Sequence, residues 1–363
     1  DGTYAITSTA GSITNSGALD IEGVGTFTVT NGQSITLDNG SNDFTATPVF
    51  AASSGTIQNV EITDTSALVF GALTVAGNLT GTISGGAVTQ SGVLVVPGTT
   101  SITATGQDVT FSNASNNFAT IGVTGADVTI RDTNAVILAA STVSGDLSVT
   151  AAGAITDSGN ISVDGSSKTA TFAAGSGNDI TLNNSNDFKT LVITSGNDVT
   201  IVDTDEINIG ASTVSGDFSV TAAGAITDSG NISVDGSSKT ATFAAGGSNN
   251  ITLNNSNDFK TLLITSGNNV SVVDTDDIAL GASDVDGTYA ITSTNGSITN
   301  SGALDIEGVG TFTVTNGQSV TLDHGSNDFT ATPVFSASSG TIQNVEITDT
   351  SALVFGALTV AGN

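Results

Sequence analysis

The phrase "STVSGDLSVTAAGAITDSGNISVDGSSKTATFAAG" occupies residues 141–175 and returns almost unchanged at residues 212–246, 71 positions later. Within it, apolar and polar residues alternate over short runs such as "DLSVTA" (146–151) and "NISVDG" (160–165). A period of two is typical of β-strands, which Val, Ile and Thr also favour. The phrase therefore predicts short strands separated by turns of Gly, Asn, Asp and Ser.

A second phrase, "NNSNDF" (183–188), shows that this spacing continues along the whole chain. With variants it occurs five times, and its closing Phe recurs once in each repeat. These phenylalanines are Phe44, Phe118, Phe188, Phe259 and Phe329. We expect Asn and Asp to satisfy a turn in each copy, while the Phe fills the core beneath it and forms a structural core ladder.

A longer period contains four of these units, because residues 1–78 return as residues 286–363. Only four positions differ: Ala10 against Asn295, Ile35 against Val320, Asn39 against His324, and Ala51 against Ser336. The sequence thus predicts one continuous β-solenoid over residues 1–363, made of repeats of about 71 residues. We expect the array to continue beyond both ends, or copies to stack head to tail, because open end coils invite association.

The expected fold is all-β: a single-stranded, right-handed parallel β-helix. The connections between candidate strands are too short for crossover helices, so parallel strands can pair only if the chain winds on itself. About three coils per repeat would give roughly 24 residues per coil. Coils of about 19 residues also fit, since "ITL" (180–182), "VTI" (199–201) and "FSV" (218–220) are evenly spaced at that interval.

Composition narrows the function. The chain of 363 residues has 34 acidic and 5 basic residues, a formal charge of -29, and is 37% hydrophobic. That apolar fraction suits a folded chain, whereas the negative charge disfavours nucleic acid and anionic lipid as partners. With no Cys, disulfides and Cys-ligated metals are excluded. No apolar run is long enough to suggest membrane insertion.

The cadence "GDLSVTAAGAITDSGNISV" (145–163) resembles the repetitive shaft of filamentous-haemagglutinin-like exoproteins, the bacterial adhesins exported by two-partner secretion. The resemblance covers the whole chain. It implies a right-handed parallel β-helix, a secreted or cell-surface location on bacteria, and a role as an adhesive or spacer fibre. It concerns the shaft alone, because the amino-terminal secretion domain of that family is not recognisable.

We expect no enzyme activity. A lyase or hydrolase would need a base or several carboxylates in one groove, and periodic residues leave little room for such a site. The lysines recur at equivalent places of the repeat, whereas Arg131 stands where other repeats carry Val202 and Val273. We interpret Arg131 as a surface substitution and His324, the single histidine, as a solvent-side one. A polysaccharide-acting β-helix enzyme is an alternative.

Calcium is the one cofactor that the sequence suggests, because turns rich in carboxylate and amide oxygens offer the ligands it prefers. The candidates, in "VDTDE" (202–206) and "VDTDD" (273–277), are Asp203, Asp205, Asp274 and Asp276. Asx turns would explain the same residues without a metal.

The sequence thus predicts a rigid acidic rod, a structural or adhesive fibre that self-associates. The alternative from the same class is a calcium-stiffened shaft that binds host-surface or matrix glycans.

Overall fold

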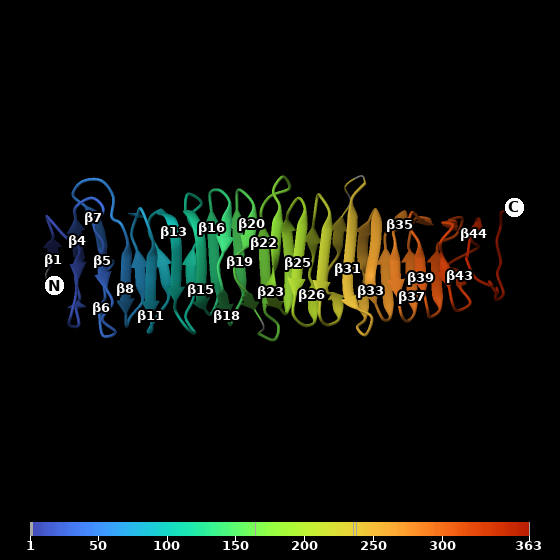
Figure 1. The fold of residues 1–363 in the computed structure, drawn as a ribbon, viewed down its shortest axis with the longest axis horizontal. Coiled ribbons are helices and arrows are strands. Elements are labelled where there is room, and N and C mark those ends of the chain that lie inside the picture. The colour runs from blue at the N-terminus through green and yellow to red at the C-terminus, as the bar shows by residue number, and fades with distance from the viewer. Residues whose placement is uncertain (1–2, 164, 235, 237, 363) are drawn as a thin grey trace. The chain divides into compact units, whose positions relative to one another are not determined.

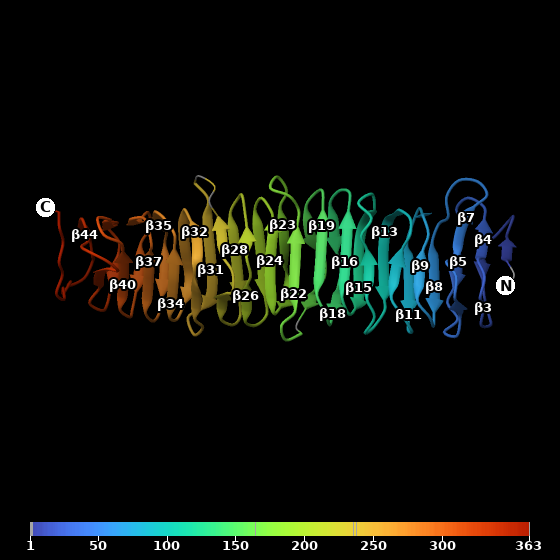
Figure 2. The same ribbon diagram turned by 180° about the vertical axis from the view of Figure 1, so that it is seen from behind.

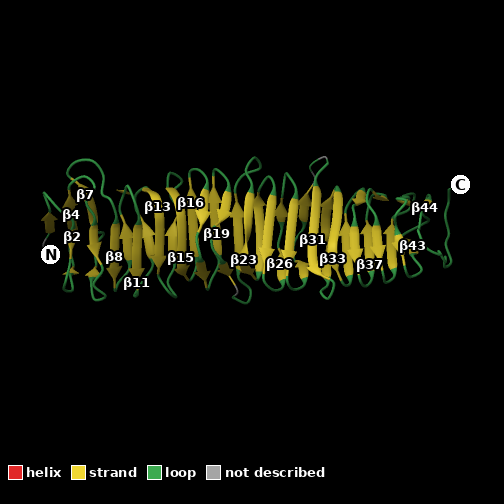
Figure 3. Ribbon diagram, in the orientation of Figure 1, coloured by secondary structure: helices red, strands yellow, loops and turns green. Residues whose placement is uncertain are grey.

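The computed structural model describes residues 3–163, 165–234, 236 and 238–362, in two compact units, Asp1–Asn178 and Asp179–Asn363. Each unit is a parallel β-solenoid, and the described residues contain no helix (Figure 3). The described part of the chain accordingly has no helical segment of the length and hydropathy that a membrane crossing requires.

In the first unit, the strands of one sheet are β2 (Ile13–Thr14), β5 (Ile35–Leu37), β8 (Val60–Asp64), β10 (Leu73–Thr74), β11 (Leu79–Ile83), β13 (Leu94–Thr103), β15 (Asn117–Gly125), β17 (Val136–Leu138), β18 (Ser141–Val143), β20 (Ile155–Asp157) and β21 (Ile161–Val163). Those of the other are β9 (Leu68–Phe70), β12 (Val88–Gln90), β14 (Val109–Phe111), β16 (Val128–Asp132), β19 (Leu147–Ala151) and β22 (Thr169–Ala173). Two small sheets comprise β1 (Tyr4–Thr7), β4 (Gly25–Val29) and β7 (Val49–Ala52), and β3 (Asp20–Ile21) and β6 (Asp43–Phe44).

In the second unit, the strands of one sheet are β23 (Ile180–Phe188), β25 (Val199–Asp203), β28 (Phe218–Ala222), β31 (Thr240–Gly246), β33 (Thr261–Gly267), β35 (Ile278–Leu280), β36 (Ser283–Val285), β38 (Ile298–Asn300), β39 (Leu304–Ile306), β41 (Val320–Leu322), β42 (Asp328–Phe329) and β44 (Val345–Ile347). Those of the other are β24 (Thr190–Ser195), β26 (Ile207–Ile209), β27 (Ser212–Thr213), β29 (Ile226–Asp228), β30 (Ile232–Val234), β32 (Ile251–Phe259), β34 (Val270–Asp274), β37 (Tyr289–Ser293), β40 (Gly310–Val314) and β43 (Val334–Ala337).

Strands pair in parallel with strands of the next coil, as the stacked arrows within each unit show (Figures 1 and 2). In the second unit β25 pairs with β28, β28 with β31, and β31 with β33. The step along the chain from Val199 to its partner Phe218 is shorter than the step from Phe218 to its own partner Ala241. Coil length therefore varies within a repeat, and each of the two coil sizes expected from the sequence fits only some of the coils.

Along the chain, single strands or pairs of short consecutive strands alternate between the two sheets, and each passage across one sheet is half a coil. From Asp203 to Asp274, one repeat apart, the chain passes through β26 and β27, β28, β29 and β30, β31, β32, β33 and then β34. A repeat thus contains seven half-coils, or three and a half coils, where the sequence predicted about three coils. Because seven is odd, Asp203 lies in one sheet and the equivalent Asp274 in the other.

The core lies between the two sheets, and its side chains come from every second residue of the strands. In β25 and β34 the residues alternate between buried and half-buried, with Val199, Ile201, Val270 and Val272 inside. Each buried Val, Leu or Ile contributes about 1.5–3 kcal/mol before conformational entropy is subtracted. That burial requires a neighbouring coil, so stacking of the coils stabilises the fold.

Candidate functional site

The five phenylalanines of the ladder all lie in the core. Their exposed fractions do not exceed 2%, the value for Phe329. Several rings contact an aromatic ring of a neighbouring coil. Phe259 packs against Phe243 with ring centroids 5.9 Å apart, and Phe329 packs against Phe312 at 6.1 Å. The aromatic side chain therefore joins coils through the core.

The backbone of each phenylalanine also joins two coils. Its N–H donates to the carboxylate of an aspartate in the following coil, at distances of 2.6–3.2 Å. The pairs are Phe44 with Asp64, Phe118 with Asp132, Phe188 with Asp203, Phe259 with Asp274, and Phe329 with Asp349. The same contact thus occurs in all five copies, and we call the aspartate that accepts this bond the clamping aspartate.

A buried asparagine two residues before each phenylalanine adds further bonds. These residues, Asn42, Asn116, Asn186, Asn257 and Asn327, are fully buried. The carbonyl of each accepts the N–H of the threonine that follows the clamping aspartate, 2.8–2.9 Å away. The Asn116 side chain accepts the N–H of Leu94 in the preceding coil and donates to the carbonyl of Phe111. We call the Asn, the Phe and the Asp–Thr pair of the next coil the staple.

The calcium candidates Asp203 and Asp274 belong to the staple. In Asp203, Oδ2 accepts the N–H of Phe188 at 2.8 Å, and Oδ1 accepts that of Asp205 at 3.0 Å. Asp274 makes the same contacts with Phe259 and Asp276 at 2.7 and 3.0 Å. Both oxygens of each buried carboxylate thus accept a backbone N–H. One bond closes the local turn and the other holds the phenylalanine of the preceding coil, so these contacts account for both residues without a metal.

Burial raises the pKa of Asp203 to about 7, although the two N–H donors oppose the shift, and the nearby carboxylates of Asp205 and Asp187 raise it further. The pKa of Asp274 is raised to about 7 for the same reasons. Burial also raises the pKa of Asp64 and of Asp132. The staple therefore contains carboxylates that are easier to protonate than free aspartate.

The other two calcium candidates, Asp205 and Asp276, lie at the half-buried edge of the staple, and Asp276 contacts a lysine. Lys260 Nζ is 2.8 Å from Asp276 Oδ2 and 3.7 Å from Asp258 Oδ1. In the equivalent place Lys189 pairs with Glu206. The structure brings Asp203 together with Asp205, and Asp274 with Asp276, but the two clusters belong to different sheets.

Comparison of the repeats shows that a lysine follows the phenylalanine only in the staples that have an additional acidic residue. The two staples with a lysine after the Phe have acidic residues at Asp205 and Asp276, two positions beyond the clamping aspartate. The other three have Ser66, Asn134 and Ser351 there, and Thr45, Ala119 and Thr330 in place of the lysine. A lysine side chain thus accompanies the additional carboxylate in each of these two staples. Among the described residues, no group of three or more acidic or His side chains has metal-binding geometry.

The remaining candidates, Arg131 and His324, lie beside staple residues without belonging to a staple. Arg131 is exposed on β16, and its backbone pairs with Thr150 of the next coil. His324 is half-buried in a turn, where its Nδ1 accepts the N–H of Ser326 at 3.3 Å. Sequence reasoning missed the buried asparagines as a separate ladder, although an Asn two residues before every ladder Phe was a visible signal.

The chain matches the family model described as repeats of unknown function (DUF5649) in five consecutive segments, residues 1–50, 57–124, 125–195, 196–266 and 267–336. The chain belongs to this family. No curated protein and no solved structure matched the sequence. The family segments have the spacing of the staples, which agrees with a repeat of roughly 70 residues.

Proposed function

We propose that this member of the repeat family is a non-enzymatic structural rod, a stalk or fibre segment that holds other parts at a distance. One observation carries the proposal: the same staple joins coil to coil five times. Its polar groups bond to the backbone of neighbouring coils, so they are occupied in holding the stack together. A repeated structural joint suits a spacer better than it suits one catalytic centre.

The adhesive and extracellular parts of this proposal rest on the resemblance to filamentous-haemagglutinin-like shafts and on composition. A chain without Cys folds in the same way in oxidising and reducing surroundings. Strong negative charge keeps such rods soluble and favours neutral partners, such as glycans or further copies, over nucleic acid. We propose a bacterial cell-surface or secreted location on these grounds.

Negative-stain electron microscopy of the purified chain tests the spacer role. Straight particles of constant width are expected, and they should lengthen when the matched segment 196–266 is duplicated. Compact particles of unchanged length would contradict the proposal.

A calcium-stiffened shaft is the competing proposal, and thermal unfolding with EDTA or with added Ca²⁺ distinguishes it. The occupied oxygens of Asp203 and Asp274 and the lysine beside Asp276 favour the metal-free rod. We therefore expect the same melting temperature in both conditions. A rise with Ca²⁺ that disappears in an Asp205→Asn/Asp276→Asn variant would favour the calcium shaft instead.

A further inference from the structure

Two variable positions flank the clamping contact in every staple: the residue before the phenylalanine, and the residue two positions beyond the clamping aspartate. In the five copies these pairs are Asp43 with Ser66, Asn117 with Asn134, Asp187 with Asp205, Asp258 with Asp276, and Asp328 with Ser351. The copies therefore provide an internal comparison of one place in the fold with different side chains.

Two of the copies show that these positions are neighbours in space. In the second staple, Asn134 Nδ2 donates to Asn117 Oδ1 at 3.2 Å. In the fourth staple a lysine lies between them, with Lys260 Nζ 2.8 Å from Asp276 Oδ2 and 3.7 Å from Asp258 Oδ1. The place between the two positions thus holds a direct hydrogen bond in one copy and a single positive charge in another.

The first staple has Asp43 and Ser66 at these positions, and Thr45 in place of the lysine. Its clamping aspartate, Asp64, is 0% exposed. Asp64 Oδ1 accepts the N–H of Phe44 at 3.2 Å, the N–H of Ser66 at 3.0 Å and the hydroxyl of Ser66 at 3.2 Å. All three of these donors therefore bind the same carboxylate oxygen.

The other oxygen, Asp64 Oδ2, is shielded from solvent, and no donor among the described residues lies within hydrogen-bond distance of it. The same holds for Asp43 Oδ1. In Asp203 and Asp274, by contrast, each of the two oxygens accepts one backbone N–H. Buried acceptors normally have a partner, so these two carboxylate oxygens point to a ligand that the protein itself does not supply.

The charge of Asp43 also acts on Asp64. Burial raises the pKa of Asp64, its hydrogen bonds with Ser66 and Phe44 lower it, and the nearby Asp43 carboxylate raises it further. Two ionised carboxylates close together in a partly buried place destabilise each other unless a positive charge lies beside them. Lys260 supplies that charge in the fourth staple, whereas Thr45 cannot supply it in the first.

We propose that the first staple binds a monovalent metal cation, K⁺ or Na⁺, through Asp64 Oδ2, Asp43 Oδ1 and the hydroxyl oxygen of Ser66. The ion takes the place that the ammonium group of Lys260 holds in the fourth staple, and it carries the same single charge. Ca²⁺ prefers about six to eight oxygen ligands, more than these three side chains offer. EDTA does not remove an alkali-metal ion, so this site is separate from the calcium shaft.

Thermal unfolding in different chloride salts tests the site. The wild-type chain at pH 8 should melt about 1–3 °C higher in KCl or NaCl than in choline chloride, because an ion that binds only the folded state stabilises it. Equal ionic strength keeps the screening of surface charges the same in all three salts. Choline is too large for the place that an ammonium group fills.

Variants assign the salt effect to the staple. The fifth staple has the same side chains at Asp328, Asp349 and Ser351, so each variant changes both copies. Thr45→Lys/Thr330→Lys supplies a cation of its own at two exposed positions, and its melting temperature should be the same in the three salts. Thr45→Gln/Thr330→Gln is the matched control, because a long neutral side chain should keep the wild-type difference.

Asp43→Asn/Asp328→Asn provides a second variant that copies a natural staple, since the second staple has Asn117 at this position. It removes the repulsion between the two carboxylates together with one ligand of the ion. This chain should also melt at the same temperature in the three salts, and in choline chloride it should be at least as stable as the wild type.

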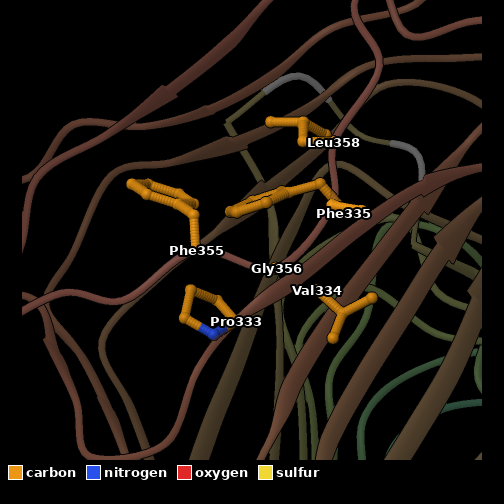
Figure 4. A pocket seen from close by; sticks show the side chains of 7 residues that line it. Pro333, Val334, Phe335, Phe355, Gly356 and Leu358 are labelled. Atoms are coloured by element: carbon orange, nitrogen blue, oxygen red, sulfur yellow. The ribbon is translucent and has the colours of Figure 1, made fainter.

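Thallium(I), which is close to K⁺ in size, locates the ion directly. A crystal soaked in a thallium(I) salt should show anomalous density between the carboxylates of Asp43 and Asp64. A hollow of about 170 Å³, to which Phe335, Phe355 and Leu358 contribute, is an internal control, because its lining side chains carry no charge (Figure 4). Thallium elsewhere on the surface without a peak in the staple would identify an adventitious ion only and overturn the site.

The salt series has its own contrary results. Equal melting of the wild-type chain in KCl, NaCl and choline chloride would overturn the proposal. A salt difference that persists in the Thr45→Lys/Thr330→Lys and Asp43→Asn/Asp328→Asn chains would place the ion outside these staples. A rise in melting temperature with Ca²⁺ that both variants abolish would show that the site takes a divalent cation, contrary to the single charge inferred from Lys260.

Discussion

Phe188 contributes to the stack in two ways, because its ring fills the core while its N–H is bonded to the next coil. Its side chain is completely buried. The sequence predicted that the Phe fills the core, from its spacing alone. It could not show the hydrogen bond to Asp203, because a bond between coils depends on coil length, which varies along the chain.

Replacing Phe188 with Ala should lower the free energy of unfolding by about 3–5 kcal/mol, the usual cost of an emptied aromatic site. Ser185→Ala, at an exposed position in the same phrase, should change it by less than about 0.5 kcal/mol. Urea unfolding followed by circular dichroism measures both. A Phe188→Ala chain as stable as the wild type would place this ring outside the core.

The aspartates of the staple predict an unusual dependence on pH. In the folded state the pKa of Asp203 and of Asp274 is about 7, above the ordinary 3.8, so folding favours the protonated form. Their contribution to stability is complete below about pH 4 and is lost as the pH rises through about 7. The urea concentration at the unfolding midpoint should therefore decrease as the pH is raised from 5 to 8.

An Asp203→Asn/Asp274→Asn chain isolates this effect, because Asn cannot titrate. Its midpoint should vary less over the same pH range than that of the wild type, whatever its absolute stability. Asp323→Asn, at an exposed position outside the staples, should keep the wild-type slope. If the double variant also keeps that slope, protonation of these two carboxylates does not couple to folding.

Among the structural elements, the half-coil is the one that sequence periodicity could not reveal. Alternation of apolar residues predicted the strands, and their short connections predicted parallel pairing. The assignment of strands to one side or the other required knowing where the chain crosses between sheets, as between β34 and β35. Because seven half-coils make a repeat, equivalent residues occur in opposite sheets and cannot form one continuous row.

The buried asparagines hold neighbouring half-coils together, so Asn116→Ala should be costly. It would leave the N–H of Leu94 and the carbonyl of Phe111 without the amide that now bonds to both. Buried groups left unsatisfied cost about 1–3 kcal/mol each. Differential scanning calorimetry should show a clear fall in melting temperature for Asn116→Ala and little change for Ser112→Ala, an exposed neighbour. Equal melting temperatures would mean that the asparagine does not hold the coils together.

In the whole molecule, we expect each repeat to be an interchangeable part of the stack. Removal of residues 218–288 deletes one complete repeat and joins Asp217 to Tyr289, which occupies the position of Phe218. The shortened chain should fold with one cooperative transition. Removal of residues 218–252 deletes about half a repeat and disrupts the staple phase, so that chain should lose cooperativity. Equal folding of both would show that phase is unimportant.

The proposed rod of stacked coils is tested most directly by small-angle X-ray scattering of the wild-type chain and the chain lacking residues 218–288. Seven half-coils at about 4.8 Å per coil span about 17 Å. We expect the maximum dimension to shorten by about 17 Å while the cross-sectional radius stays constant. A shortened chain with the same maximum dimension, or with a smaller cross-section, would contradict it.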